Sequence, residues 1–222
     1  TYLGNAEHYI KQHEYEIAGN FLRKEAESFC KEFLPKKLHY TLEYSLLDLN
    51  GLICNCKKFA EESGMEDITL FDELDDYRKF VLNPSSHDSY DVVKYEHEVK
   101  KCFDTLTELR KIQFQKIFDK GQKVAFTLKT SAPNEEVFKF EITICDDFRL
   151  IIQDEYESII SKGLINYNVF KNGYNEKGIQ SDNTTLKRFY DVKYNKSDKS
   201  VSANFLDSIV DIATGNPIRT LL

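Results

Sequence analysis

The chain has 222 residues, of which 41% are hydrophobic, 30 are basic and 37 are acidic, which gives a formal net charge of −7. This composition supports a folded core but excludes a global basic field, so contact with nucleic acid would need a local basic patch. No apolar run reaches the roughly 18 to 20 residues of a membrane span, and no secretory signal opens the chain. We therefore expect a soluble, cytoplasmic protein without membrane contact.

The methionine and cysteine content indicates where the chain comes from and whether it binds a metal or forms disulfides. It begins at Thr1 and holds a single methionine, Met65, which we interpret as a domain of a longer parent protein. Its five cysteines are odd in number, and their spacings match neither a zinc site nor the CxxC redox motif. We expect reduced, mostly buried cysteines, and we predict no cofactor and no metal.

The first half of the chain has the periodicity of helices. Apolar residues recur every three or four positions, and charged residues fill the opposite faces. Asn5 is the expected N-cap of the first helix, and Pro35 bounds the second. The pattern predicts helices over residues 5–12, 15–33, 45–59 and 66–80, and a long last helix from residue 91 to residue 118.

After Gly121 the apolar residues alternate with polar ones instead. Residues 122–130 and 136–145 predict an antiparallel hairpin with one buried face, because every second side chain of a strand points the same way. Three further stretches rich in aromatic and β-branched residues predict strands: "FRLII" (148–152), "LINYNVF" (164–170) and "LKRFYDVKYN" (186–195).

The last stretch, "SANFLDSIVDIATG" (202–215), predicts a closing helix that Ser202 caps and Gly215 ends. The whole pattern predicts an α+β protein. An N-terminal α-helical bundle (1–119) precedes a smaller α+β domain with antiparallel strands (120–222), and the boundary lies near residues 118–122.

One loop brings together residues that could be catalytic. In "RKFVLNPSSHDS" (78–89), Arg78 ends one predicted helix and His87 lies in the loop before the next. An imidazole can move a proton and a guanidinium can stabilise charge on a phosphate, which are the needs of RNA cleavage. The simpler interpretation is a helix boundary, because Pro84 ends the first helix and the serines can cap the second.

A second candidate site lies near the C-terminus, where basic and aromatic residues interleave. This mixture can hold phosphates and stack on bases, or contact a protein partner. A hairpin with a solvated basic face is the alternative. The residues concerned are Lys187, Arg188, Tyr190, Lys193 and Tyr194.

Three stretches carry a resemblance to a known group: "HYIKQHEYEIAGNFLRKEAESFCKEFLP" (8–35), "LNPSSHDS" (82–89) and "YEHEVKKCFDTLTELRKI" (95–112). Together they resemble the segment downstream of the ATPase core in bacterial RecF/SMC-like AAA ATPases, some of them associated with phage defence. Gly173 and Gly178 have Walker A spacing, but Ile179 and Gln180 stand where lysine and serine or threonine must bind phosphate and magnesium. The resemblance therefore implies an accessory or effector domain, with an ATPase head as its partner.

The helical bundle also resembles HEPN domains, though more loosely. Many HEPN domains are metal-independent ribonucleases with an Arg-x4–6-His motif across a homodimer. Here eight residues separate Arg78 from His87, and Pro84 interrupts the helical turn. We predict a non-catalytic interaction and regulatory domain of, or partner to, a RecF/SMC-like ATPase in DNA metabolism or phage defence. The alternative is a HEPN-like ribonuclease that uses Arg78 and His87, and nucleic acid is a second candidate partner.

Overall fold

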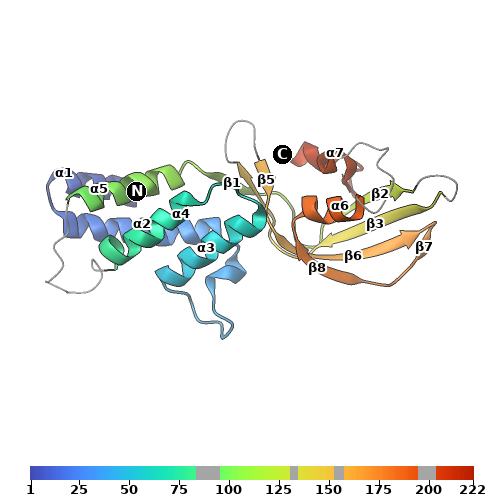
Figure 1. Cartoon of the computed structure of the whole chain (residues 1–222), viewed down its shortest axis with the longest axis horizontal. Helices are drawn as coiled ribbons and strands as arrows, with labels where there is room; N and C mark the ends of the chain where they lie inside the picture. Colours follow the sequence, from blue (N-terminus) through green and yellow to red (C-terminus); the bar gives the residue numbers. More distant parts are fainter. Residues whose placement is uncertain (84–95, 131–134, 153–157, 195–203) are drawn as a thin grey trace. The chain divides into compact units, whose positions relative to one another are not determined.

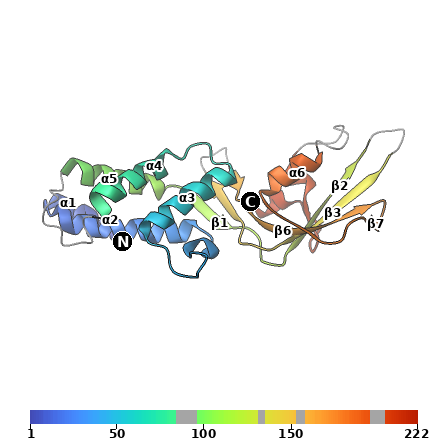
Figure 2. The ribbon, with the colours of Figure 1, turned by 60° about the horizontal axis from the view of Figure 1, so that its bottom comes forward.

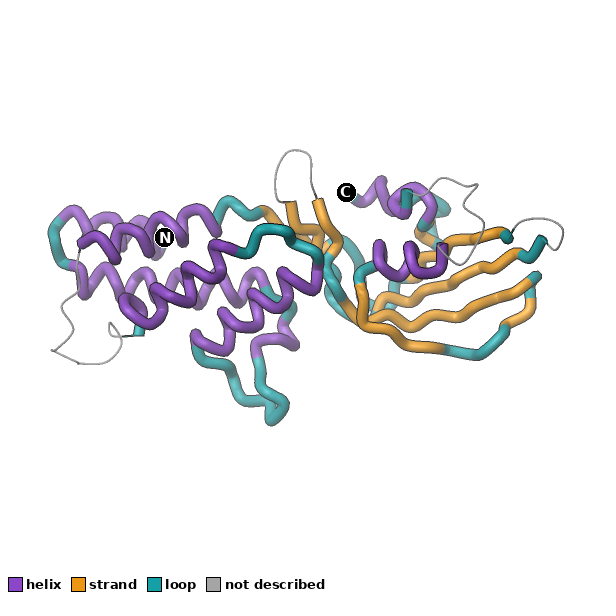
Figure 3. The backbone as a smooth tube through the Cα atoms, viewed as in Figure 1, coloured by secondary structure: helices purple, strands orange, loops and turns teal. Residues whose placement is uncertain are grey.

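The computed structural model describes residues 1–83, 96–130, 135–152, 158–194 and 204–222. The chain divides into two compact units, Thr1–Gln113 and Phe114–Leu222, which we call unit 1 and unit 2. Unit 1 is helical and unit 2 is built on antiparallel sheets (Figures 1 and 3), so the predicted α+β class is confirmed. In the part of the chain that is described, no helix is long and apolar enough to cross a membrane.

The helices of unit 1 match most of the predicted ones. The predicted helices at the start of the chain are confirmed, with ends shifted by about one turn at most. A 3₁₀ turn (Lys36–His39) follows the second helix, and a π turn (Arg78–Leu82) extends the fourth. The described α-helices are α1 (Tyr2–Lys11), α2 (Tyr15–Phe33), α3 (Leu49–Ser63), α4 (Thr69–Tyr77) and α5 (Glu96–Leu109).

Capping and backbone chemistry explain where these helices begin and end. Thr1, and not the predicted Asn5, caps α1, because its hydroxyl oxygen accepts a backbone hydrogen bond at 3.1 Å. Asp48 caps α3 in the same way at 2.8 Å. Gly64 ends α3 with a φ of +97°, a left-handed conformation that glycine adopts without strain. As predicted, α2 ends just before Pro35.

An aromatic cluster holds three of these helices together. Phe29 and Phe33 of α2 lie 6.3 Å and 5.3 Å from Phe71 of α4, measured between ring centroids. Phe59 of α3 meets Phe33 edge to face at 5.7 Å. All four side chains are buried, and such pairs add to the stabilisation from burial alone.

A buried carboxylate ties α2 to the residue that follows α5. The Glu25 side chain is only 5% exposed, and Arg110 Nε donates a hydrogen bond to its Oε1 at 2.5 Å. Arg110 Nη1 donates to Glu32 Oε2 at 2.6 Å. Because a buried charge without a partner is strongly destabilising, Arg110 fixes the end of α5 against α2.

The Glu32 carboxylate makes the stability of unit 1 depend on pH. The hydrogen bond from Arg110 lowers the pKa of Glu32 below its usual value of 4.5. A pKa that is lower in the folded state contributes stability above the unfolded pKa, and this contribution is lost as the pH falls through the folded pKa. We expect the Glu32→Gln variant to lose less unfolding free energy than the wild type between about pH 5 and pH 3 in urea titrations. Parallel losses in the two proteins would contradict this role for Glu32.

The last helix of unit 1 ends earlier than predicted. The described part of α5 ends at Leu109, and the chain enters strand β1 (Gln113–Lys116) instead of continuing as helix to residue 118. The seven-residue apolar series of Val92, Val99 and Leu106 reaches a polar residue at Gln113, so the apolar helical face does not continue. The units accordingly divide at Gln113, before the expected boundary at 118–122.

Unit 2 contains two antiparallel sheets among its described residues. The predicted hairpin is confirmed as β2 (Lys123–Lys129) and β3 (Val137–Ile144), which lie at the centre of a six-stranded sheet. This sheet has the order β7-β6-β3-β2-β9, and β8 also pairs with β6. Its other strands are β6 (Gly163–Lys171), β7 (Tyr174–Asn175), β8 (Gln180–Thr184) and β9 (Val210–Asp211).

The stretch "FRLII" forms a strand, but not next to the hairpin. It contains β4 (Arg149–Ile152), which lies between β1 and β5 (Ser158–Ile160) in a separate three-stranded sheet. Leu150 and Ile160 pair across β4 and β5 and are both buried. Strand β4 therefore pairs with β1, at the start of the unit, and not with β3.

The stretch "LKRFYDVKYN" is a helix, which corrects the predicted strand. It forms α6 (Leu186–Tyr194), and its buried residues are Leu186, Phe189, Tyr190 and Tyr194. These positions are three, one and four residues apart, so they lie on one helical face. The strand prediction followed the aromatic content and missed this period. Packing of that face against the six-stranded sheet stabilises the helix (Figure 2).

The closing helix is also corrected, because most of residues 204–215, the part that the structure describes, are not helical. Within this part α7 (Phe205–Ser208) is the only helix, and the side-chain oxygen of Asn204 caps it by accepting a hydrogen bond from Leu206 N at 3.1 Å. Ser202, the predicted cap, lies outside the described residues. The chain then extends as β9 along β2, and Gly215 forms a turn after this strand at a φ of +73°. A 3₁₀ turn (Ile218–Leu221) follows.

Gly163, the first residue of β6, has no room for a side chain. A Cβ atom there would lie 2.7 Å from Cε2 of Phe148, which is fully buried. We expect Gly163→Ala to lower the free energy of unfolding by about 1–3 kcal/mol in urea titrations, the usual cost of overpacking a core. In the double variant with Phe148→Leu, the two losses should be less than additive because the smaller side chain leaves room. Strict additivity would show that the two positions do not clash.

Candidate functional site

A groove of about 260 Å³ lies on the face of the six-stranded sheet that packs against α6. Strands β2, β3, β6 and β8, the turn after β7, and α6 all contribute to it. Its floor is apolar and its rim is polar. The lining residues are Leu128, Thr130, Phe138, Phe140, Val169, Glu176, Lys177, Gln180 and Lys193.

The register of the sheet places the floor residues together. Leu128 of β2 pairs directly with Phe138 of β3, and Phe140 of β3 pairs directly with Val169 of β6. Side chains of paired residues point to the same face, and residues two apart along a strand do so as well. Leu128, Phe140 and Val169 are all buried, so the floor is part of the core.

Lys193 provides a positive charge where the groove meets α6. Its Nζ lies 5.0 Å from the ring centroid of Phe189, 5.1 Å from that of Tyr167 and 5.9 Å from that of Phe140. A cation over aromatic faces is attracted by their negative charge density. The ammonium group is therefore held at the groove while its stem lies against apolar rings.

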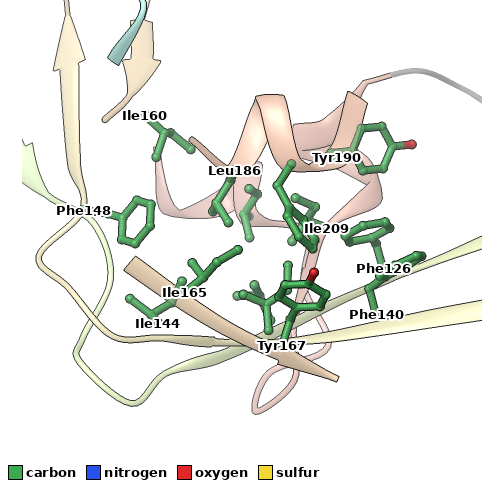
Figure 4. Close-up of a cluster of buried hydrophobic side chains, with 14 of the residues drawn as sticks. Phe126, Phe140, Ile144, Phe148, Ile160, Ile165, Tyr167, Leu186, Tyr190 and Ile209 are labelled. Carbon is green, nitrogen blue, oxygen red and sulfur yellow. The ribbon is translucent and has the colours of Figure 1, made fainter. Parts of the chain in front are cut away.

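Aromatic packing beneath Lys193 fixes α6 in place. Figure 4 shows Tyr190 of α6 beside Phe126 and Phe140 of the sheet. The Phe126 ring lies 5.0 Å from Tyr190 and 4.7 Å from Phe140, and the Tyr167 ring lies 4.7 Å from Phe189. The groove is therefore preformed by the core, and a ligand would not have to organise it.

Polar groups line the end of the groove near β8. Tyr167 Oη donates a hydrogen bond to Gln180 Oε1 at 2.8 Å. Burial raises the pKa of Tyr167, and the charge of Asp182 adds to this effect, so the phenol stays protonated and remains a donor at neutral pH. Tyr174 of β7 is 81% exposed, and Ile179, on the turn that holds Glu176 and Lys177, is 74% exposed. Apolar surface thus continues beyond the groove.

The structure brings one of the predicted C-terminal residues to this site. Lys193 lines the groove, whereas Lys187 and Arg188 are exposed elsewhere on α6. Tyr190 and Tyr194 are 1% and 8% exposed because they form the buried face of the helix. Their rings are therefore not available for stacking on a nucleic-acid base.

Arg78 of the predicted catalytic pair belongs to the π turn after α4. Its side chain is 14% exposed, and its Nε donates a hydrogen bond to Asp75 Oδ1 at 2.8 Å. His87 lies outside the described residues. The segment just before it is anchored, since Arg23 Nη1 of α2 donates to Asn83 Oδ1 at 3.0 Å. This contact joins α2 to the end of the π turn.

Of the residues that line the groove, sequence reasoning identified Lys193 alone as a contact residue. They come from separate strands, and only the register and the helix α6 bring them together. Among the described residues, no group of three or more His, Cys, Asp or Glu side chains could hold a metal ion. What the groove can do chemically is bind an apolar group next to a negative charge.

No protein-family model, curated protein or solved structure matches this chain.

We expect Lys193→Ala to lower the free energy of unfolding by about 1 kcal/mol, because the variant loses the cation over the aromatic rings and the packing of the lysine stem. Lys187→Ala on the same helix is the matched control, and it should change stability by less than about 0.5 kcal/mol because that side chain is exposed. Urea unfolding followed by tyrosine fluorescence measures both. Equal effects of the two substitutions would contradict the described position of Lys193.

Proposed function

We propose that this chain is a non-catalytic interaction and regulatory module that acts with a RecF/SMC-like ATPase, and that the groove in unit 2 is its partner-binding site. The observation that carries the proposal is the groove itself, which has an apolar floor and Lys193 at its edge. The resemblance of three stretches of unit 1 to RecF/SMC-like proteins supports the choice of partner class.

The size of the groove favours part of a protein over a small-molecule ligand. Sites for drug-sized ligands usually enclose about 300–1,000 Å³. A volume of about 260 Å³ instead suits one or two anchor side chains of a protein segment. Exposed Tyr174 of β7 and exposed Ile179 of the turn after it would extend the contact, and aromatic residues are common where binding energy is concentrated.

The charges at the rim indicate which segment would bind. Among the described residues that line the groove, Lys177 and Lys193 are basic and Glu176 is acidic. An apolar segment with a carboxylate therefore complements the site better than a basic segment does. Nucleic acid is less favoured as the ligand, since the buried Tyr190 and Tyr194 cannot stack on bases.

Selection of displayed peptides against the whole chain tests the groove. We expect selected peptides to combine large apolar residues with aspartate or glutamate. Their affinity should fall by about tenfold or more in Lys193→Glu, because the charge at the site is reversed. The matched control Lys187→Glu, at an exposed position of the same helix, should bind as the wild type does.

Peptides that bind Lys193→Glu and the wild type equally well would contradict the proposed site. The regulatory part of the proposal has its own measurement, the ATP hydrolysis rate of a RecF/SMC-like ATPase head from the same organism. The wild-type chain should change this rate, and Lys193→Glu should not. An unchanged rate with the wild-type chain would contradict the choice of partner.

A further inference from the structure

The loop after the 3₁₀ turn of unit 1 exposes large apolar side chains. We call residues 40–46 the tip. It projects from the helices of unit 1 (Figure 3). The exposed fractions are 44% for Tyr40, 100% for Leu42, 89% for Tyr44 and 67% for Leu46. Single exposed apolar residues are ordinary, but four in seven residues mark an interaction surface.

The tip is held in one conformation by its own hydrogen bonds. Tyr40 and Leu46 form a β-bridge, and Thr41 N donates to the carbonyl oxygen of Ser45 at 2.8 Å. Thr41 Oγ1 accepts hydrogen bonds from Glu43 N at 3.2 Å and Ser45 N at 3.3 Å. A partner would therefore meet a preorganised surface and would lose little entropy in ordering it.

The backbone of the tip also contains an unfavourable conformation. Tyr44 has a φ of +61°, in the left-handed region that suits glycine and asparagine and disfavours bulky side chains. Folding gains nothing from this ring, which is 89% exposed. A strained residue with no role in the core indicates selection for something other than stability.

The charges near the tip favour a protein surface over a lipid surface. Residues 36–48 hold two lysines, Lys36 and Lys37, and two acids, Glu43 and Asp48, so their net charge without histidine is zero. Glu43 stands between Leu42 and Tyr44, and insertion of the tip would carry its carboxylate into the membrane interface. Segments that bind anionic lipids have an excess of basic residues instead.

The groove of unit 2 has the complementary chemistry. Its floor offers Phe138, Phe140 and Val169 to an apolar side chain, and its rim offers Lys177 and Lys193 to a carboxylate. The sequence Leu42-Glu43-Tyr44 supplies both groups in adjacent positions. We infer that the tip of one copy of this chain docks in the groove of a second copy, with Leu42 or Tyr44 on the apolar floor and Glu43 beside the lysines.

This inference rests on the proposed function, because it uses the same groove. It makes the self-association head-to-tail, since the two surfaces in contact are different. In a single contact, the copy that supplies the tip keeps an unused groove, and the copy that supplies the groove keeps an unused tip. Such contacts form closed rings or open chains, and a partner segment that fills the groove would dissociate them.

Sedimentation equilibrium of the full chain over roughly 1 µM to 1 mM, the span of weak association, tests the inference. We expect the average mass to rise with concentration. Leu42→Ser and Lys193→Glu should each weaken the association by about tenfold or more. An equimolar mixture of these two variants should still form a one-to-one complex, because one supplies an intact groove and the other an intact tip.

Two further variants separate docking from folding. Tyr44→Gly should raise the thermal unfolding midpoint, since glycine tolerates the positive φ, and should weaken the association. The triple variant should associate more strongly than Glu43→Lys alone, because the charges of the tip and the groove are again of opposite sign. This triple variant combines Glu43→Lys, Lys177→Glu and Lys193→Glu.

Several outcomes would overturn the inference. They are a monomer at every concentration, association that Leu42→Ser leaves unchanged, and variants whose mixture does not associate. Binding of the wild type, but not of Leu42→Ser, to vesicles of phosphatidylcholine and phosphatidylserine would assign the tip to lipid instead. If self-association fails while selected peptides still require Lys193, the tip has another partner and the proposed function stands.

Discussion

The aromatic packing between α6 and the six-stranded sheet is the interaction on which the candidate site depends. The rings of Phe126 of β2 and Phe140 of β3 stack on each other, with their centroids 4.7 Å apart. Phe189 and Tyr190 of α6 cover these two rings. The same contacts place Lys193 over the rings at the edge of the groove. Without this layer the groove would lose one wall and the positive charge of Lys193 together, so stability and binding share one set of side chains.

Much of the fold could be predicted from local patterns. The period of three to four residues identified α1 to α4, and strict alternation identified the β2–β3 hairpin, because burial of one face imposes these periods. The predictions were wrong where composition competed with period. The stretch 186–195 is rich in aromatic residues that suit strands, yet the spacing of Leu186, Phe189, Tyr190 and Tyr194 is helical.

The candidate site was much less accessible to sequence reasoning. Lys193 was singled out for its basic and aromatic neighbours, but the floor of the groove depends on which strands pair and in what register. That information is not local. The positive φ of Tyr44 is equally invisible in the sequence, because a tyrosine gives no signal for a conformation that glycine or asparagine would normally occupy. Both surfaces needed the three-dimensional arrangement.

A surface that exposes Leu42, Glu43 and Tyr44 and a groove that suits such a segment give the chain two matched elements of an interaction module. The most direct measurement replaces Leu42 with the photoreactive residue benzoylphenylalanine and mixes this chain with an isotopically labelled wild-type copy before irradiation. Docking of the tip in the groove predicts crosslinks between copies at the groove residues of β3, the turn after β7, and α6. Crosslinks confined to other surfaces, or absent between copies, would contradict it.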